Sequence, residues 1–166
     1  MREPILPERV GSDREAMSLA IRCALAGVEQ GQSPFGCCIT RHGRVLACTG
    51  NTVWQDTDPT SHAEVNAIKA ACHRLGKIDL SGCTLYATCE PCPMCFSAAH
   101  WARISRIVYG ADIRDAQRAG FNEIRLWARE LRKLSGNELE LVPGFMRDEC
   151  LGVFEQWQRL GRGEPY

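Results

Sequence analysis

Apolar positions recur along the chain with two different periods, and the changes of period divide the sequence into helices and strands. Ser12-Asp13-Arg14-Glu15 has the spacing of a helix capping box, and apolar positions at helical spacing after it predict a first helix that runs to Gly31. Two short apolar runs, residues 35–40 and 45–49, flank Arg41-His42-Gly43-Arg44, where the glycine suits a tight turn. The pattern therefore predicts a helix followed by a β-hairpin.

The rest of the chain alternates between helices and strands. Polar, turn-rich residues 51–61 precede a helical pattern that covers 62–75 and that Gly76 ends. The same reading predicts strands at 83–88, 104–109 and 139–142, and helices at 93–102, 113–119, 124–134 and 148–160. Because strands interleave with helices and the hairpin adds antiparallel pairing, we expect an α/β fold, a three-layer α/β/α sandwich around a central mixed five-stranded sheet.

Length and charge narrow the class of protein. The chain has 166 residues, about one domain's length, so we expect residues 1–166 to form a single domain. Its 20 lysine and arginine residues balance 20 aspartate and glutamate residues, which argues against a large nucleic-acid footprint. No apolar run reaches the roughly 18 residues of a membrane span, and the N-terminus lacks a signal-peptide stretch. We expect a cytoplasmic protein without a membrane partner.

Two fragments of the sequence carry ligands for a metal ion. His62-Ala63-Glu64 opens one predicted helix, and Pro91-Cys92-Pro93-Met94-Cys95 opens the next. Cys92 and Cys95 are one helical turn apart, so both sulfurs face one point. One imidazole and two thiolates leave a tetrahedral zinc ion with a fourth position for water, as in catalytic sites. We expect one Zn²⁺ per chain, bound by His62, Cys92 and Cys95, with Glu64 as the nearby base.

The remaining cysteines and the large aromatic residues are interpreted as structural. Cys89 stays open as a third thiolate because it lies three residues before Cys92, although His62 makes Cys92 and Cys95 the favoured pair. Trp101 and Trp127 stand at helical positions and are expected in the core or in a subunit interface. The other cysteines lie mostly in apolar, element-like segments and are expected to be reduced: Cys23, Cys37, Cys38, Cys48, Cys72, Cys83 and Cys150.

The two metal-binding fragments also carry a family resemblance. A His-x-Glu sequence followed by Pro-Cys-x-x-Cys is the pattern of zinc-dependent nucleobase deaminases, in which the glutamate carries protons and is not a ligand. The chain resembles the cytidine deaminase-like superfamily and, within it, the purine-base branch typified by bacterial guanine deaminases. The resemblance covers most of the chain and rests on Pro34-Phe35-Gly36, Asn51, Asp58-Pro59-Thr60-Ser61-His62-Ala63-Glu64-Val65, Cys89-Glu90-Pro91-Cys92-Pro93-Met94-Cys95, Trp101-Ala102-Arg103 and Ala119-Gly120-Phe121.

The resemblance implies a reaction and further site residues. It implies that a free purine base is deaminated hydrolytically, with guanine going to xanthine and ammonia. Gly120-Phe121-Asn122-Glu123 resembles the segment in which an acidic residue joins Glu64 in proton transfer. Asn122 departs from an acidic pair, which leaves Glu123 as the second catalytic residue. Asn51 matches the base-binding asparagine of the family, and Phe35 is expected to stack on the purine ring.

The C-terminal segment, residues 161–166, has two interpretations. Its polar, glycine-containing sequence is typical of a disordered tail. The resemblance instead implies a homodimer in which this segment crosses to the partner and closes its pocket, with Tyr166 as a substrate-binding lid. The sequence alone leaves both interpretations open.

Three functions compete at this stage. Deamination of a purine base, or of another aminated heterocycle or nucleoside, needs only the zinc site and a pocket. A tRNA-specific adenosine deaminase shares Pro-Cys-x-x-Cys but requires a basic groove, which the neutral charge balance does not indicate. A non-catalytic zinc module would keep the three ligands without a need for Glu64.

Overall fold

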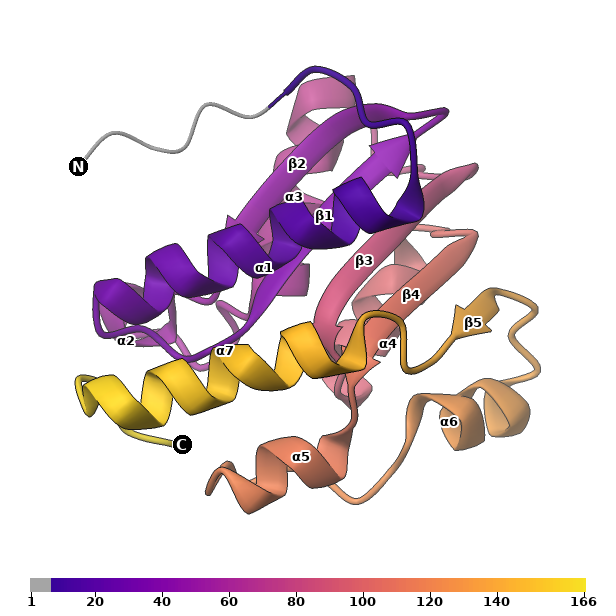
Figure 1. Cartoon of the computed structure of the whole chain (residues 1–166). Coiled ribbons are helices and arrows are strands. Elements are labelled where there is room, and N and C mark those ends of the chain that lie inside the picture. The colour runs from indigo at the N-terminus through magenta and orange to yellow at the C-terminus, as the bar shows by residue number, and fades with distance from the viewer. Residues whose placement is uncertain (1–6) are drawn as a thin grey trace.

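A mixed five-stranded sheet forms the middle layer of the structure, a computed structural model that describes residues 7–166 (Figure 1). The strand order is β2-β1-β3-β4-β5. β1 pairs antiparallel with β2 and β3, whereas the β3–β4 and β4–β5 pairs are parallel. The predicted mixed sheet is therefore confirmed. The strands are β1 (Gly36–Arg41), β2 (Arg44–Gly50), β3 (Cys83–Cys89), β4 (Arg106–Ala111) and β5 (Glu140–Val142).

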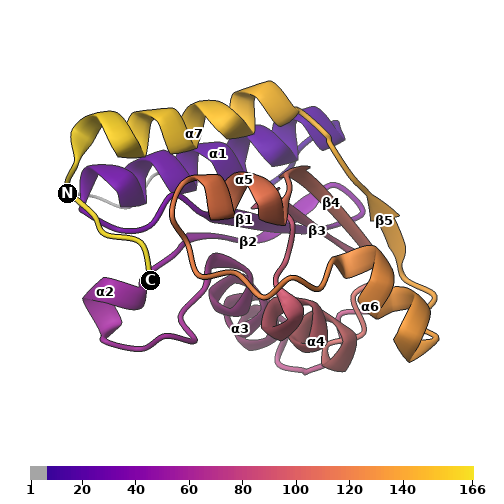
Figure 2. The same ribbon diagram turned by 90° about the horizontal axis from the view of Figure 1, so that it is seen from below.

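Helices cover both faces of the sheet, as the view along its layers shows (Figure 2). One outer layer holds α1 (Asp13–Glu29), α5 (Ile113–Arg118) and α7 (Arg147–Leu160). The other holds α3 (Ala63–Leu75), α4 (Pro93–Trp101) and α6 (Ala128–Ser135), while the short α2 (Val53–Asp56) lies near the C-terminus. The three-layer prediction is confirmed. Within the described part of the chain, no helix is both long and apolar enough to cross a membrane.

Alternating side chains of the strands supply two separate hydrophobic cores. In β1, Cys37 and Ile39 belong to the core that includes residues of α3 and α4, whereas Cys38 belongs to the core that includes residues of α1 and α7. β4 repeats this pattern with Ile107 and Val108 on opposite faces. Because both faces are buried, the strands appear in the sequence as continuous apolar runs.

Two glycines are required where the backbone turns or where two elements approach closely. Gly43, with a φ of 75°, and His42, with a φ of 49°, make the tight turn of the β1–β2 hairpin. At Gly36, the first residue of β1, a Cβ atom would lie 2.1 Å from the carbonyl oxygen of Ala20. Only glycine therefore lets α1 pack this closely on the sheet.

Two predicted boundaries are wrong, whereas the other elements agree with the prediction to within about two residues. Residues 51–61, predicted as a loop, contain the one-turn helix α2. The helix predicted over 124–134 begins only at Ala128, because the N–H of Ala128 donates to the buried carboxylate of Glu90 at 2.8 Å. The second difference arises from a contact between residues far apart in the sequence.

Of the two positions expected for Trp101, core or subunit interface, the core is excluded, because its side chain is 79% exposed. Phe96 and Ala99, three residues apart, form the buried face of α4. Trp101 follows Ala99 by two positions and so projects from the opposite side of the helix. The cysteines, in contrast, behave as predicted, since all ten are free.

We predict that Asp115→Asn lowers the free energy of unfolding by about 2 kcal/mol at neutral pH, the scale of a buried hydrogen bond to a charged group. The Asp115 side chain is only 2% exposed, accepts the N–H of Asp112 at 2.8 Å and pairs with Arg147 at 2.6 Å. It thereby closes the capping box of α5 and ties α5 to α7. Urea denaturation measures the loss.

The pH dependence of this difference follows from the pKa of Asp115. Burial alone would raise that pKa, but the N–H of Asp112 and the guanidinium of Arg147 lower it overall. The ionised carboxylate therefore stabilises the fold above the ordinary aspartate pKa of about 3.9, and this stabilisation is lost as pH falls through the lowered value. The deficit of Asp115→Asn should shrink in acid. Equal stability of Asp115→Asn and the exposed control Asp148→Asn would contradict the prediction.

Candidate functional site

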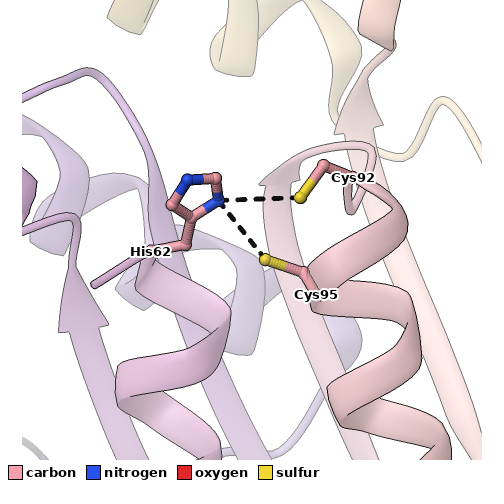
Figure 3. A group of neighbouring side chains, drawn as sticks. All are labelled: His62, Cys92 and Cys95. Atoms are coloured by element: carbon pink, nitrogen blue, oxygen red, sulfur yellow. Dashed lines mark hydrogen bonds between the residues drawn. The ribbon is translucent and has the colours of Figure 1, made fainter. Parts of the chain in front are cut away.

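The three predicted metal ligands stand at the N-terminal ends of α3 and α4, which pack against each other (Figure 3). His62 is the N-cap residue of α3, and Cys92 is the N-cap residue of α4. Pro93 follows at the first helical position, where a missing N–H costs nothing, and Cys95 lies within the first turn. The two helix ends therefore bring all three side chains to one point.

The spacing of the ligand atoms fits a zinc ion. Nδ1 of His62 lies 3.7 Å from Sγ of Cys92 and 3.4 Å from Sγ of Cys95. In a tetrahedral zinc site, ordinary Zn–N and Zn–S bonds place such atoms about 3.6 Å apart. All three ligand atoms lie within 4.8 Å of one another, and residues 7–166 contain no other cluster of this kind.

Cys89 does not join this group of ligands. Its thiol lies 3.5 Å from the carbonyl oxygen of Asp112 and donates a hydrogen bond to it. Cys89 is also absent from the group of side chains whose ligand atoms lie close to one another. The pair Cys92 and Cys95 is therefore the one that the structure places beside His62.

The charges at the site favour metal binding. A hydrogen bond from Cys95 lowers the pKa of Cys92 to about 4, against the effect of burial, and His62 adds to this. Cys92 thus carries the thiolate, which is the form that binds a metal. The free N–H groups at the starts of α3 and α4 favour negative charge at the same point.

Glu64 lies at the first turn of α3, two residues after His62, and is only 7% exposed. Burial raises its pKa to about 7, although the neighbouring His62 lowers it in part. A carboxyl group with a pKa in this range gains and loses protons readily at neutral pH. Its placement fits a residue that transfers protons beside the metal ligands.

A cavity of about 250 Å³ opens beside His62 and Cys92. Glu123, from the segment between α5 and α6, is part of its wall. Burial raises the pKa of Glu123 to about 7, and the negative charge of Cys92 adds to this effect. Glu123 is thus a second carboxyl group of raised pKa near the metal ligands, in addition to Glu64. The residues that line the cavity are Pro59, His62, Cys92, Pro93, Met94, Phe121, Asn122, Glu123, Ile124 and Tyr166.

The C-terminal residue, Tyr166, reaches this cavity in its own chain. Its hydroxyl accepts a hydrogen bond from Nδ2 of Asn51 at 2.8 Å, and its carbonyl oxygen accepts the N–H of Asn122 at 2.9 Å. Its ring lies edge-on to His62, with 5.8 Å between the ring centroids. Oδ1 of Asn51 accepts the N–H of Val53 at 3.1 Å, so the amide is held in a fixed orientation. The tail and Asn51 thus form one hydrogen-bonded unit beside the metal ligands.

Phe35 is placed behind the cavity wall. Its ring packs edge-on against Phe121 at 4.9 Å and against Phe154 at 5.6 Å, between ring centroids. Phe121 lines the cavity and Phe35 does not. Phe121 therefore presents a ring at the cavity, whereas the stacking of Phe35 on a substrate stays a prediction.

Sequence reasoning missed one residue of this region, Glu90. Its side chain is buried, with 4% exposure, and its carboxylate accepts N–H groups from Ile113 and Ala128. The available signal was a charged residue directly between an apolar strand and Pro91, a position where an unpaired charge is costly.

The comparisons with known proteins agree with this geometry. Residues 10–111 match the family model of the cytidine and deoxycytidylate deaminase zinc-binding region. The chain is 38% identical over 150 residues to a guanine deaminase of Bacillus subtilis (strain 168), covering 89% of this chain and 94% of that protein. It is 32% identical over 147 residues to a tRNA-specific adenosine deaminase of the same organism, covering 89% of each.

A solved structure shares the fold. The guanine deaminase from Nitrosomonas europaea superposes with a TM-score of 0.86 over 93% of this chain and 89% of that chain, at 23% sequence identity. The matched family region contains all three metal ligands and Glu64. The chain therefore belongs to the zinc-dependent cytidine and deoxycytidylate deaminase family.

Proposed function

We propose that the protein deaminates guanine hydrolytically, giving xanthine and ammonia. The similarity to a guanine deaminase extends over nearly the full length of both chains, which supports this substrate. The observation that carries the proposal is the cavity of about 250 Å³ beside the metal ligands, with Tyr166 in its wall. Because this volume is at the small end of ligand sites, a free base fits it better than a nucleoside or a nucleic-acid strand.

Glu64 and Glu123 carry out different proton transfers in the reaction. When bound by His62, Cys92 and Cys95, zinc would supply a Lewis acid that lowers the pKa of water, so that hydroxide is available as the nucleophile at neutral pH. Glu64 takes the proton from the attacking water and passes it to a ring nitrogen of the base. Glu123 protonates the departing amino group, because ammonia is a better leaving group than its anion. The two raised pKa values suit these exchanges.

Asn51 and Phe121 orient the base. Asn51 is not itself among the residues that line the cavity, but its amide has one N–H and one lone pair beyond its contacts with Tyr166 and Val53, and these match the donor and acceptor of a purine edge. Phe121 presents its ring at the cavity wall and is supported from behind by Phe35. These contacts would hold the amino-bearing carbon of the purine ring beside the metal ligands.

Removal of residues 161–166 should impair turnover and spare zinc content. The tail supplies a wall of the cavity and a partner for Asn51, but it supplies no metal ligand. The finer variant Tyr166→Phe keeps the ring and removes one hydrogen bond, so it should raise KM by roughly 2- to 10-fold. Steady-state kinetics with zinc analysis measure both. Unchanged kinetics of the truncated protein would remove the lid role.

We also propose a homodimer, following the family resemblance. Trp101 is 79% exposed, and aromatic residues exposed on a single chain are enriched at protein–protein interfaces, which supports the interface position expected for it. Light scattering should give twice the 18.5 kDa chain mass. A monomeric mass would contradict the dimer and with it any crossing of the tail to a partner.

A substrate panel tests the proposed function. Ammonia release from guanine, adenine, cytosine, guanosine and tRNA should be fastest with guanine, and chelator-treated protein serves as the blank. Release from tRNA alone would favour the adenosine deaminase that the 32% identical relative represents. No release from any member would instead favour a non-catalytic zinc module.

A further inference from the structure

We propose that Glu90 is a positioning residue that holds the segment carrying Glu123 in register with the zinc-binding loop. Glu90 follows the last residue of β3 and precedes Cys92 by two positions. The inference rests on the proposed function insofar as Glu123 transfers protons. Its structural basis, a set of hydrogen bonds from one buried carboxylate, is independent of the substrate.

The carboxylate of Glu90 accepts N–H groups from both ends of that segment. Oε1 accepts the N–H of Ala128 at 2.8 Å, and Oε2 accepts the N–H of Ile113 at 3.3 Å. Ile113 and Ala128 are the first residues of α5 and α6, whose N–H groups have no partner within their helices. The backbone N–H of Glu90 also donates to Ala111 at 2.8 Å. One side chain therefore contacts the first N–H group of both helices, in addition to the capping box that Asp112 and Asp115 form at α5.

The stretch between these two helices, residues 119–127, has no regular secondary structure of its own and forms one wall of the cavity. Within it, the N–H of Glu123 donates to the carbonyl oxygen of Phe121 at 3.0 Å, and the N–H of Asn122 donates to Tyr166 at 2.9 Å. The contacts at Glu90 anchor the two flanking helices to the loop that carries Cys92. The position of Glu123 relative to the metal ligands therefore depends on Glu90.

The carboxylate is suited to this role because it accepts two hydrogen bonds and donates none. In Glu90→Gln, one acceptor oxygen remains and the amide N–H₂ group faces the second N–H donor. One buried N–H then loses its partner, and one helix start is released. A small displacement of a reacting group lowers the reaction rate strongly: a shift of about 1 Å can lower it roughly 100-fold.

A double-mutant cycle tests the inference in the zinc-loaded protein with guanine. Glu90→Gln should lower kcat by roughly 10- to 100-fold with little change in KM and with one zinc per chain retained. Glu123→Gln should lower kcat by about 100-fold or more. If Glu90 acts through Glu123, the double variant should be no slower than Glu123→Gln. Multiplied losses, or zinc loss in Glu90→Gln, would overturn the inference.

Two additions keep the test decisive. If Glu90→Gln does not fold, Glu90→Asp replaces it in the cycle, because the shorter side chain keeps the charge and cannot reach both N–H groups. The exposed Glu138→Gln is the matched control and should behave as the unmodified protein.

Hydrogen exchange measured by mass spectrometry separates this inference from the proposed function. Residues 119–127 should exchange faster in Glu90→Gln than in the unmodified protein, while α1 is unchanged. This faster exchange is expected whatever the substrate is. If the protein released no ammonia from guanine, the expected exchange result would stay the same. Equal exchange of residues 119–127 in both proteins would overturn the role of Glu90, and normal turnover of Glu123→Gln would overturn the role of Glu123 alone.

Discussion

Glu64→Gln is expected to reduce ammonia release from guanine to background, a fall of roughly 10⁴-fold, while one zinc ion per chain is retained. The glutamine side chain has the same shape, so the 7% exposed position can accept it without repacking. The amide cannot take a proton from water or pass one to the base. Because Glu64 is not among the three clustered ligands, the substitution removes proton transfer and leaves metal binding intact.

The experiment pairs kinetics with elemental analysis. Zinc per chain is measured by mass spectrometry of the dialysed protein, and ammonia release is followed over a concentration series of guanine. Glu155→Gln, an exposed position on α7, is the control and should keep full activity. Substantial turnover by Glu64→Gln would assign the main proton transfer to Glu123 instead.

Cys95→Ser is expected to lose zinc and, with it, all activity. The Cys95 thiol is buried and lies 3.4 Å from Nδ1 of His62, so no other sulfur can take its place without a backbone shift. A serine hydroxyl does not ionise at neutral pH and is a poor zinc ligand. Since metal binding contributes to folding free energy, the melting temperature should fall to that of chelator-treated protein.

Cys89→Ser is the matched control for this loss. Cys89 is the last residue of β3 and lies near Cys95 in the sequence, but its thiol donates to the carbonyl oxygen of Asp112 and a serine hydroxyl can keep that bond. Zinc content and activity should therefore be retained. Zinc retention by Cys95→Ser, or zinc loss by Cys89→Ser, would mean that the ligand set is different.

Features set by short stretches of sequence could be predicted from the sequence alone. Ile107 and its neighbours are buried on both faces of the sheet, so β4 was visible as an apolar run. Gly43 marked the hairpin turn. The metal ligands were predictable because Cys92 and Cys95 share one helical turn and His62 caps another helix.

Features that depend on contacts between distant segments could not be predicted in this way. The start of α6 is set by Glu90, 38 residues earlier in the chain, and no periodicity records that contact. The hydrogen bond between Asn51 and Tyr166 spans 115 residues within one chain, and no local pattern predicts it; the family resemblance implied a tail at the partner's pocket. The exposure of Trp101 depends on which face of α4 meets the sheet. These are tertiary effects that override local patterns.

X-ray absorption at the zinc edge tests the central claim most directly. The purified protein should contain one zinc ion per chain, with two sulfur neighbours at about 2.3 Å and two nitrogen or oxygen neighbours at about 2.0 Å. This spectrum corresponds to His62, Cys92 and Cys95 with a water molecule in the fourth position. Three or four sulfur neighbours, or protein without zinc, would contradict it.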